Sequence, residues 1–250
     1  MIGNGPRAPF EAFFLPAGGG GRFCIFHPAS GAPLGSILYA HPFAEEMNKS
    51  RRMAALQARA FCALGYSVLQ IDLLGCGDSS GEFGEARWDV WNDDLALAAG
   101  WLARHAEGPM HLWGLRLGAL LAADHVRQAP QSFAGLLLWQ PVLSGAQFMT
   151  QFLRLRLGAE MLSGAAAGKG TEQLRAQLAA GEALEIAGYE LAPQLASAIQ
   201  RLDLASLAPE RSSVCSARLG HGALAAPRSI CMPCAASRSG AASRLPSARS

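Results

Sequence analysis

The stretch "HLWGLRLGALLAADH", residues 111–125, combines a short apolar run, a Gly-x-Arg-x-Gly turn and a helical pattern. This order is typical of a buried strand that turns directly into a helix. Arg116 stands at the centre of the turn. A guanidinium has no free lone pair at neutral pH, so it cannot act as a nucleophile. We therefore predict a strand, a sharp turn and a helix, with a cation at the turn.

Short apolar runs on both sides of this stretch predict a sheet. They lie at residues 36–40, 67–72, 110–113 and 135–139. Nearly continuous apolar runs are expected of strands that are buried on both faces of a parallel sheet. Segments of helical crossover length separate them, which predicts a doubly wound α/β fold with right-handed crossovers. Before them, residues 10–16 and 22–28 flank "AGGGG" and predict an antiparallel edge hairpin.

The first two crossover helices have clear patterns. The first is predicted to begin with Asn48 as N-cap and to stop at Gly65. Its core-facing residues are predicted to be Met53, Leu56, Ala60 and Leu64. The second helix stops before Gly108, and its core-facing residues are predicted to be Trp88, Trp91, Leu95, Ala98 and Leu102.

The C-terminal part of the chain divides into two regions. Residues from about 147 to 201 are rich in Ala, Gln and Leu and too long for one crossover, which predicts a helical cap insert at about 145–200 within a domain of residues 1–210. Residues 211–250 hold nine Ser, nine Ala and six Arg but no acid and no aromatic residue, a composition typical of disorder. We consider Cys231 and Cys234 an accidental pair, because no second pair has zinc-site spacing.

The abrupt change near residues 208–214 suggests a shift of reading frame in the gene. A frame shift would remove the last strands of the sheet and leave an unpaired edge, and we then expect poor solubility.

Charge and hydropathy exclude several classes of protein. The net charge of +2 is distributed unevenly. Residues 1–210 contain 15 Lys and Arg and 19 acids, a net charge of −4, whereas the last 40 residues have a net charge of +6. A body at −4 does not suggest nucleic-acid binding. We find neither an apolar run of membrane-spanning length nor a signal-peptide pattern, so we expect a cytoplasmic protein without a membrane span. Oligomeric state is not specified by these patterns.

Two glycine-rich motifs fail as nucleotide sites. In "GCGDSSG", residues 75–81, Ser80 replaces the third glycine of a dinucleotide fingerprint. In "GAAAGKGT", residues 164–171, a glycine follows Lys169 where a phosphate loop needs Ser or Thr. We therefore expect no cofactor and no metal.

Three motifs stand at strand ends in a characteristic order: "YAHPF", "DLLGCGDSSG" and "WGLRLG". Together they resemble the α/β-hydrolase superfamily. The segments "LYAHPFAEEMNKSRRM", "LQIDLLGCGDSSG", "LWGLRLGALLA" and "LLLWQPVLSG" resemble more closely the exosortase A system-associated hydrolases of the second type, bacterial proteins that accompany exopolysaccharide loci. The resemblance covers about residues 10–210. It implies an α/β-hydrolase fold with a mostly parallel sheet, flanking helices, a helical cap and an incomplete C-terminal part.

The resemblance also implies roles for individual residues. Phe43 and Leu117 would supply the backbone N–H groups of an oxyanion hole, and Arg116 occupies the nucleophile position. The chain departs from the family because Arg116 replaces serine and Pro42 replaces the usual glycine. The family's acid and histidine should follow on later loops, but the acids end at Glu210 and His221 lies in the tail.

Two functions are compatible with these features. One is an ester or thioester hydrolase or acyltransferase that works without the serine; whether the chain is an enzyme stays open. The other is a non-catalytic protein, a pseudoenzyme, that binds an anionic small molecule at Arg116. Glu45, Glu46 and Asp78 should project toward the same rim and pair with Arg116 in the resting protein. We expect these three acids and His41 to line the ligand site, with His41 shaping its loop through a hydrogen bond.

Overall fold

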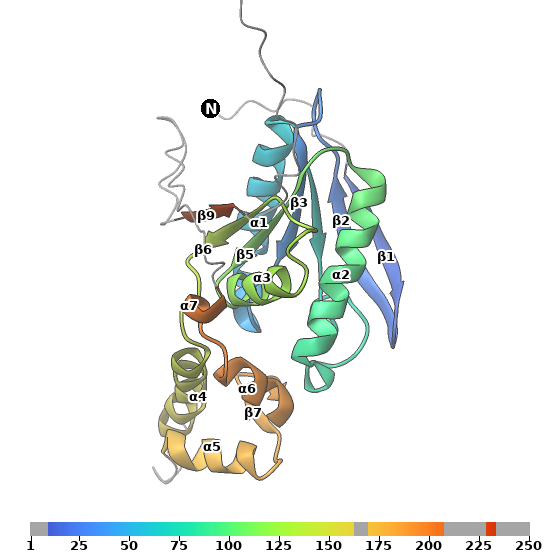
Figure 1. The fold of residues 1–250 in the computed structure, drawn as a ribbon. Coiled ribbons are helices and arrows are strands. Elements are labelled where there is room, and N and C mark those ends of the chain that lie inside the picture. The colour runs from blue at the N-terminus through green and yellow to red at the C-terminus, as the bar shows by residue number, and fades with distance from the viewer. Residues whose placement is uncertain (1–9, 163–169, 208–228, 234–250) are drawn as a thin grey trace, which may run out of the picture.

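The computed structural model describes residues 10–162, 170–207 and 229–233. A seven-stranded sheet with the order β1-β2-β4-β3-β5-β6-β9 forms the centre of the molecule (Figure 1). Its strands are β1 (Glu11–Ala17), β2 (Gly20–His27), β3 (Gly35–Ala40), β4 (Tyr66–Ile71), β5 (Met110–Leu115), β6 (Gly135–Trp139) and β9 (Ser229–Pro233). β3, β4, β5 and β6 run parallel to their neighbours within that group. This confirms the predicted parallel strands.

The N-terminal hairpin is also confirmed. β1 pairs with β2 in antiparallel register, and β2 pairs antiparallel with β4. At the other edge, β9 pairs antiparallel with β6. Five residues of the tail therefore cover the edge of β6, the kind of edge that a frame shift was expected to leave unpaired. The rest of the tail, with His221 and Cys234, lies outside the described residues, as does the proposed frame-shift position.

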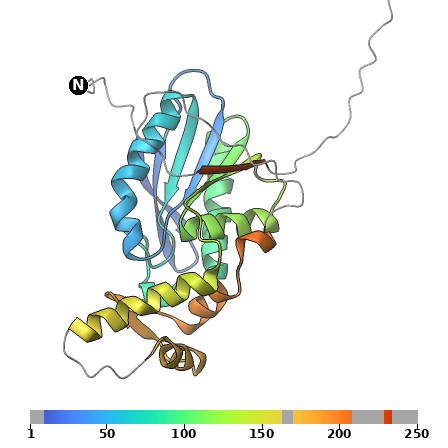
Figure 2. The same ribbon diagram turned by 90° about the vertical axis from the view of Figure 1, so that its left-hand side faces the viewer.

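Three helices cover the two faces of the sheet (Figure 2). α1 (Glu45–Ala63) lies on one face, and α2 (Trp88–His105) and α3 (Leu117–Gln128) lie on the other. Each face has its own cluster of buried apolar residues. The order of the strands reverses at β3, because the chain continues to β4 on one side and then crosses to β5 on the other. In such sheets, ligands bind at the carboxyl ends of the strands beside this reversal.

The buried face of α1 differs from the predicted one. Leu56 and Leu64 are more than half exposed, and the buried residues are Met47, Ala54, Ala58 and Cys62. The predicted N-cap is also wrong, since the helix begins at Glu45 with Ala44 as N-cap. The face of α1 that packs on the sheet carries mostly small side chains, which let the helix axis approach the sheet closely. The larger apolar residues that were predicted to face the sheet lie on the solvent side instead. The predicted stop is confirmed: α1 ends at Ala63, and Gly65 follows with a φ of 94°.

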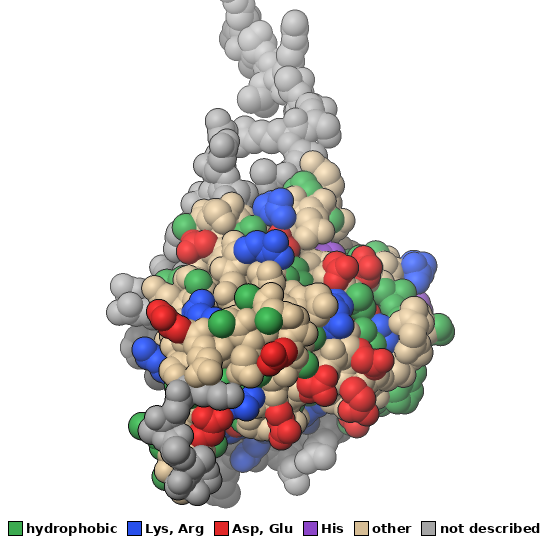
Figure 3. Space-filling model, turned by 90° about the horizontal axis from the view of Figure 1, so that it is seen from below, with side chains coloured by type: hydrophobic (Ala, Val, Ile, Leu, Met, Phe, Trp, Pro, Cys, Tyr) green, Lys and Arg blue, Asp and Glu red, His purple; other side chains and the backbone are tan. Residues whose placement is uncertain are grey.

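The chain after β6 forms a separate layer beyond one end of the sheet (Figure 1). It consists of α4 (Gly145–Leu162), α5 (Thr171–Ala179) and α6 (Pro193–Gln200), with a short hairpin of β7 (Leu184–Ile186) and β8 (Tyr189–Leu191). α7 (Leu204–Leu207) follows. The expected cap is helical as predicted, but the sequence analysis missed the hairpin. Acidic, basic and hydrophobic side chains are interspersed on the face that Figure 3 shows from below.

Candidate functional site

The turn between β5 and α3 has the sharp geometry that the sequence predicts. Arg116 has a φ of 55° and a ψ of −118°, a left-handed conformation that is strained for a residue with a side chain. Its N–H donates to the carbonyl of Trp139 (3.0 Å), and its carbonyl accepts from Val142 (3.2 Å). The strained turn is therefore fixed by β6 and by the chain that follows it.

Two glycines make the turn possible. A Cβ on Gly114 would lie 2.4 Å from the Cα of Ala119. A Cβ on Gly118 would lie 2.3 Å from the carbonyl oxygens of Ala40 and His41. The start of α3 thus packs directly on the loop that follows β3, and this contact brings Arg116 beside Phe43.

Two backbone donors next to the turn are free. Within the described residues, no hydrogen-bond acceptor contacts the N–H of Phe43 or that of Leu117. Leu117 is the first residue of α3, where N–H groups have no partner within the helix and the helix dipole favours negative charge. Both N–H groups can therefore bind an anionic oxygen.

The side chain of Arg116 forms an ion pair with Glu46. Its Nε and Nη2 lie 3.3 and 3.2 Å from the same oxygen, Oε1. The other two predicted acids do not contact Arg116 in the described part of the chain: Glu45 pairs with Lys49 at 3.1 Å, and Asp78 is exposed in the loop after β4. Only one of the three expected acids therefore pairs with Arg116.

Arg116 and Glu46 line a pocket of about 170 Å³ under the cap. Its lining consists of Phe43, Glu45, Glu46, Arg116, Phe148, Gln151, Phe152 and Leu155. The last four belong to α4, so the cap forms one wall of the pocket. His41 and Asp78 do not line it; they line two neighbouring cavities.

His41 has a structural environment. Its Nε2 accepts from the N–H of Leu73 (3.3 Å), so the proton is on Nδ1, which donates to the carbonyl of Pro42 (2.7 Å). Burial lowers the pKa of His41 below its usual 6.5, although the carboxylate of Asp72 opposes this shift. Both ring nitrogens are occupied, which agrees with the expected role of shaping the loop.

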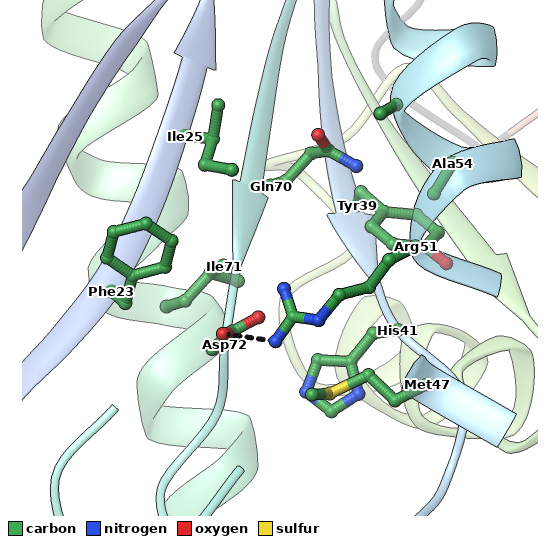
Figure 4. A pocket seen from close by; sticks show the side chains of 11 residues that line it. Phe23, Ile25, Tyr39, His41, Met47, Arg51, Ala54, Gln70, Ile71 and Asp72 are labelled. Carbon is green, nitrogen blue, oxygen red and sulfur yellow. Dashed lines mark hydrogen bonds and ion pairs between the residues drawn. The ribbon is translucent and has the colours of Figure 1, made fainter. Parts of the chain in front are cut away.

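The sequence analysis missed an ion pair beside His41. Arg51 of α1 reaches Asp72 at the end of β4, with Nη2 2.7 Å from Oδ2 (Figure 4). Asp72 also accepts from the N–H of Asp78 at 3.0 Å. The pair joins α1 to the loop after β4, and a Cβ on Gly77 would collide with both of its side chains. In the sequence, the position of Asp72 directly after an apolar strand was a usable signal. Nothing in the sequence marked Arg51, 21 residues earlier, as its partner.

Comparison with known proteins agrees with this geometry. Residues 31–225 match the family model described as serine aminopeptidase, S33. The chain belongs to the serine aminopeptidase S33 family. A search of curated proteins found no match. The fold is the α/β-hydrolase fold, with a mostly parallel sheet between helices.

Several solved structures are similar to this chain. The chain is similar to Est1E from Butyrivibrio proteoclasticus, solved with ferulic acid bound, at 14% identity and a TM-score of 0.56 over 78% of this chain and 73% of that one. A carboxyl esterase from Bacillus coagulans has 16% identity and a TM-score of 0.50, over 66% of this chain and 55% of that one. An α/β serine hydrolase homologue from Coxiella burnetii has 22% identity and a TM-score of 0.45, over 52% of this chain and 62% of that one.

The chain thus spans less than two thirds of the length of the latter two proteins. No described helix is both long and apolar enough to cross a membrane.

Proposed function

We propose that this S33 family protein binds an anionic small molecule at Arg116 and does not attack an ester with a serine. The observation that carries the proposal is the position of Arg116: it replaces the nucleophile at the turn, and its guanidinium faces a pocket under the cap. Family membership favours a small-molecule ligand. A guanidinium and two free N–H groups together present only donors to that ligand.

A second candidate is an ester or thioester hydrolase or acyltransferase that works without the serine. The free N–H groups of Phe43 and Leu117 favour it, since such donors stabilise the oxyanion of acyl transfer. Within the described residues, however, neither a serine nor a histidine lines the pocket of Arg116. The geometry therefore supports binding better than hydrolysis.

The proposal keeps the closer family resemblance as its biological setting. The segments around His41, Asp72 and Arg116 resemble exosortase-associated hydrolases, so we infer an association with an exosortase and exopolysaccharide system. We also keep the division into a hydrolase-like domain at residues 1–210, a cap at about 145–200 and a tail at 211–250.

Calorimetry on Arg116→Ala tests the proposal. With 3-phenylpropanoate as the probe, we expect the substitution to weaken binding by about 2–5 kcal/mol, the usual cost of truncating one partner of a hydrogen-bonded charge pair that the bound ligand buries. Arg52→Ala is the matched control, because it removes an exposed cation outside the pocket and should leave affinity unchanged. Unchanged affinity in Arg116→Ala, with a large drop in melting temperature, would show that Arg116 is structural.

A fluorophosphonate probe tests the second candidate. Such probes label activated serines, so we expect no labelling of the purified protein. Labelling would contradict the proposal that this protein lacks serine chemistry.

A further inference from the structure

The resting ion pair at Arg116 is poorly matched. Both guanidinium nitrogens contact one oxygen of Glu46, at 3.3 and 3.2 Å, and the other oxygen, Oε2, is buried without a partner among the described residues. A carboxylate in the fork geometry of arginine uses both oxygens, at about 2.7–2.9 Å. Glu46 therefore satisfies Arg116 only in part.

The two partners are also free to separate. Their side chains are 34% and 35% exposed, and Glu46 lies in the first turn of α1 near solvent. An ion pair this exposed is held weakly, because water competes with it. A better-matched carboxylate can therefore compete with Glu46 for Arg116.

The wall of the pocket that α4 forms is mostly apolar, with Gln151 as its polar side chain. Phe43 packs edge-to-face on Phe148 and Phe152, with ring centroids 5.5 and 5.0 Å apart, and Leu155 continues this wall toward solvent. Rings arranged in this way accept another ring or a branched aliphatic group, and burial of that group adds to affinity. The volume of about 170 Å³ is the room that about six water molecules take in the liquid.

We infer that the ligand is a small monocarboxylic acid with an apolar body, whose carboxylate replaces Glu46 on Arg116. The apolar body lies against Phe148, Phe152 and Leu155. This inference rests on the proposed function, that Arg116 holds an anion, and adds the class of anion. Glu46 is then a resident carboxylate that competes with the ligand.

The competition predicts an unusual effect of mutation. Removing the charge of Glu46 should raise the affinity for the acid, because the ligand no longer has to displace another carboxylate. Glu107 supplies the control, since it is an exposed acid that does not line this pocket. We expect Glu46→Gln to bind 3-phenylpropanoate at least threefold tighter than the wild type, and Glu107→Gln to change its affinity less than twofold.

The ligand class is tested by calorimetry on the wild type with three probes. They are 3-phenylpropanoate, acetate, which lacks the apolar body, and 3-phenylpropan-1-ol, which lacks the charge. We expect acetate and the alcohol each to bind at least tenfold more weakly than 3-phenylpropanoate. Because this comparison needs no variant, it does not depend on how a mutant folds.

The outcomes separate the inference from the proposed function. If acetate binds as tightly as 3-phenylpropanoate, Arg116 holds an anion but the apolar body plays no part, and the inference fails alone. If Glu46→Gln binds the acid no tighter than the wild type, the inference that the ligand carboxylate takes the place of Glu46 on Arg116 is wrong. If neither carboxylate binds, both the inference and the proposed function are overturned.

Discussion

Gly118 leaves no space for a side chain at the point where α3 meets the loop after β3. A Cβ there would lie 2.3 Å from two backbone oxygens, which cannot move without shifting the loop that carries Phe43. We expect Gly118→Ala to lower the free energy of unfolding by roughly 1–3 kcal/mol or more, the usual cost of overpacking. Urea denaturation measures it.

Gly158 in α4 is the matched control for that substitution. A Cβ there meets nothing within 4 Å, and alanine stabilises a helix by roughly 0.5–1 kcal/mol relative to glycine. Gly158→Ala should therefore be neutral or stabilising. Equal effects of the two alanines would show that the turn does not pack as tightly as described.

α1 packs on the sheet through small side chains. Ala58 is fully buried between the helix and the sheet, and Leu56 is 52% exposed. We expect Ala58→Leu to cost roughly 1–3 kcal/mol, because the helix must move away from the sheet. Leu56→Ala should change stability by less than about 0.5 kcal/mol, as is usual at the surface. Thermal denaturation of both variants checks the orientation of α1; the reverse ranking would favour the face that the sequence predicts.

The strands were predictable because each is a short apolar run between segments of helical length. The turn at Arg116 was predictable from Gly114 and Gly118. The face of α1 was not, because Leu56 and Leu64 are more hydrophobic than Ala54 and Ala58, and hydropathy alone says nothing about how closely a helix approaches a sheet.

Two further features depended on information that the sequence conveys weakly. The hairpin of β7 and β8 has only three residues in each strand, although the alternation in "LEIAGYEL" was a usable signal. At the candidate site, the sequence placed Glu45, Glu46 and Asp78 near Arg116 but could not choose among them. The choice depends on helix phase and loop path, which only the folded chain defines.

The whole molecule should lose stability in mild acid. Burial lowers the pKa of His27, His41, His111 and His125 below the usual 6.5. Below pH 6.5 the histidines of the unfolded chain therefore bind protons that those of the folded chain do not. The free energy of unfolding consequently decreases as the pH is lowered. Melting temperature should decrease between about pH 7.5 and 5.5.

One variant tests the cause of that decrease. His125→Gln removes a buried histidine of lowered pKa and should reduce the dependence of the melting temperature on pH. Burial raises the pKa of Asp94, which acts in the opposite direction in more acidic solution, so the measurement stays above about pH 5.5. A melting temperature that rises toward pH 5.5 would contradict the prediction.

The sheet separates two apolar clusters of unequal extent, and this has a consequence for local unfolding. The cluster beneath α1 contains few residues besides those of the sheet itself, while the cluster on the other face includes α2, α3 and much of the cap. Segments that bury less apolar surface open at lower cost. Amide hydrogens of α1 should therefore exchange with deuterium before those of α3, even though both helices lie against the same parallel strands.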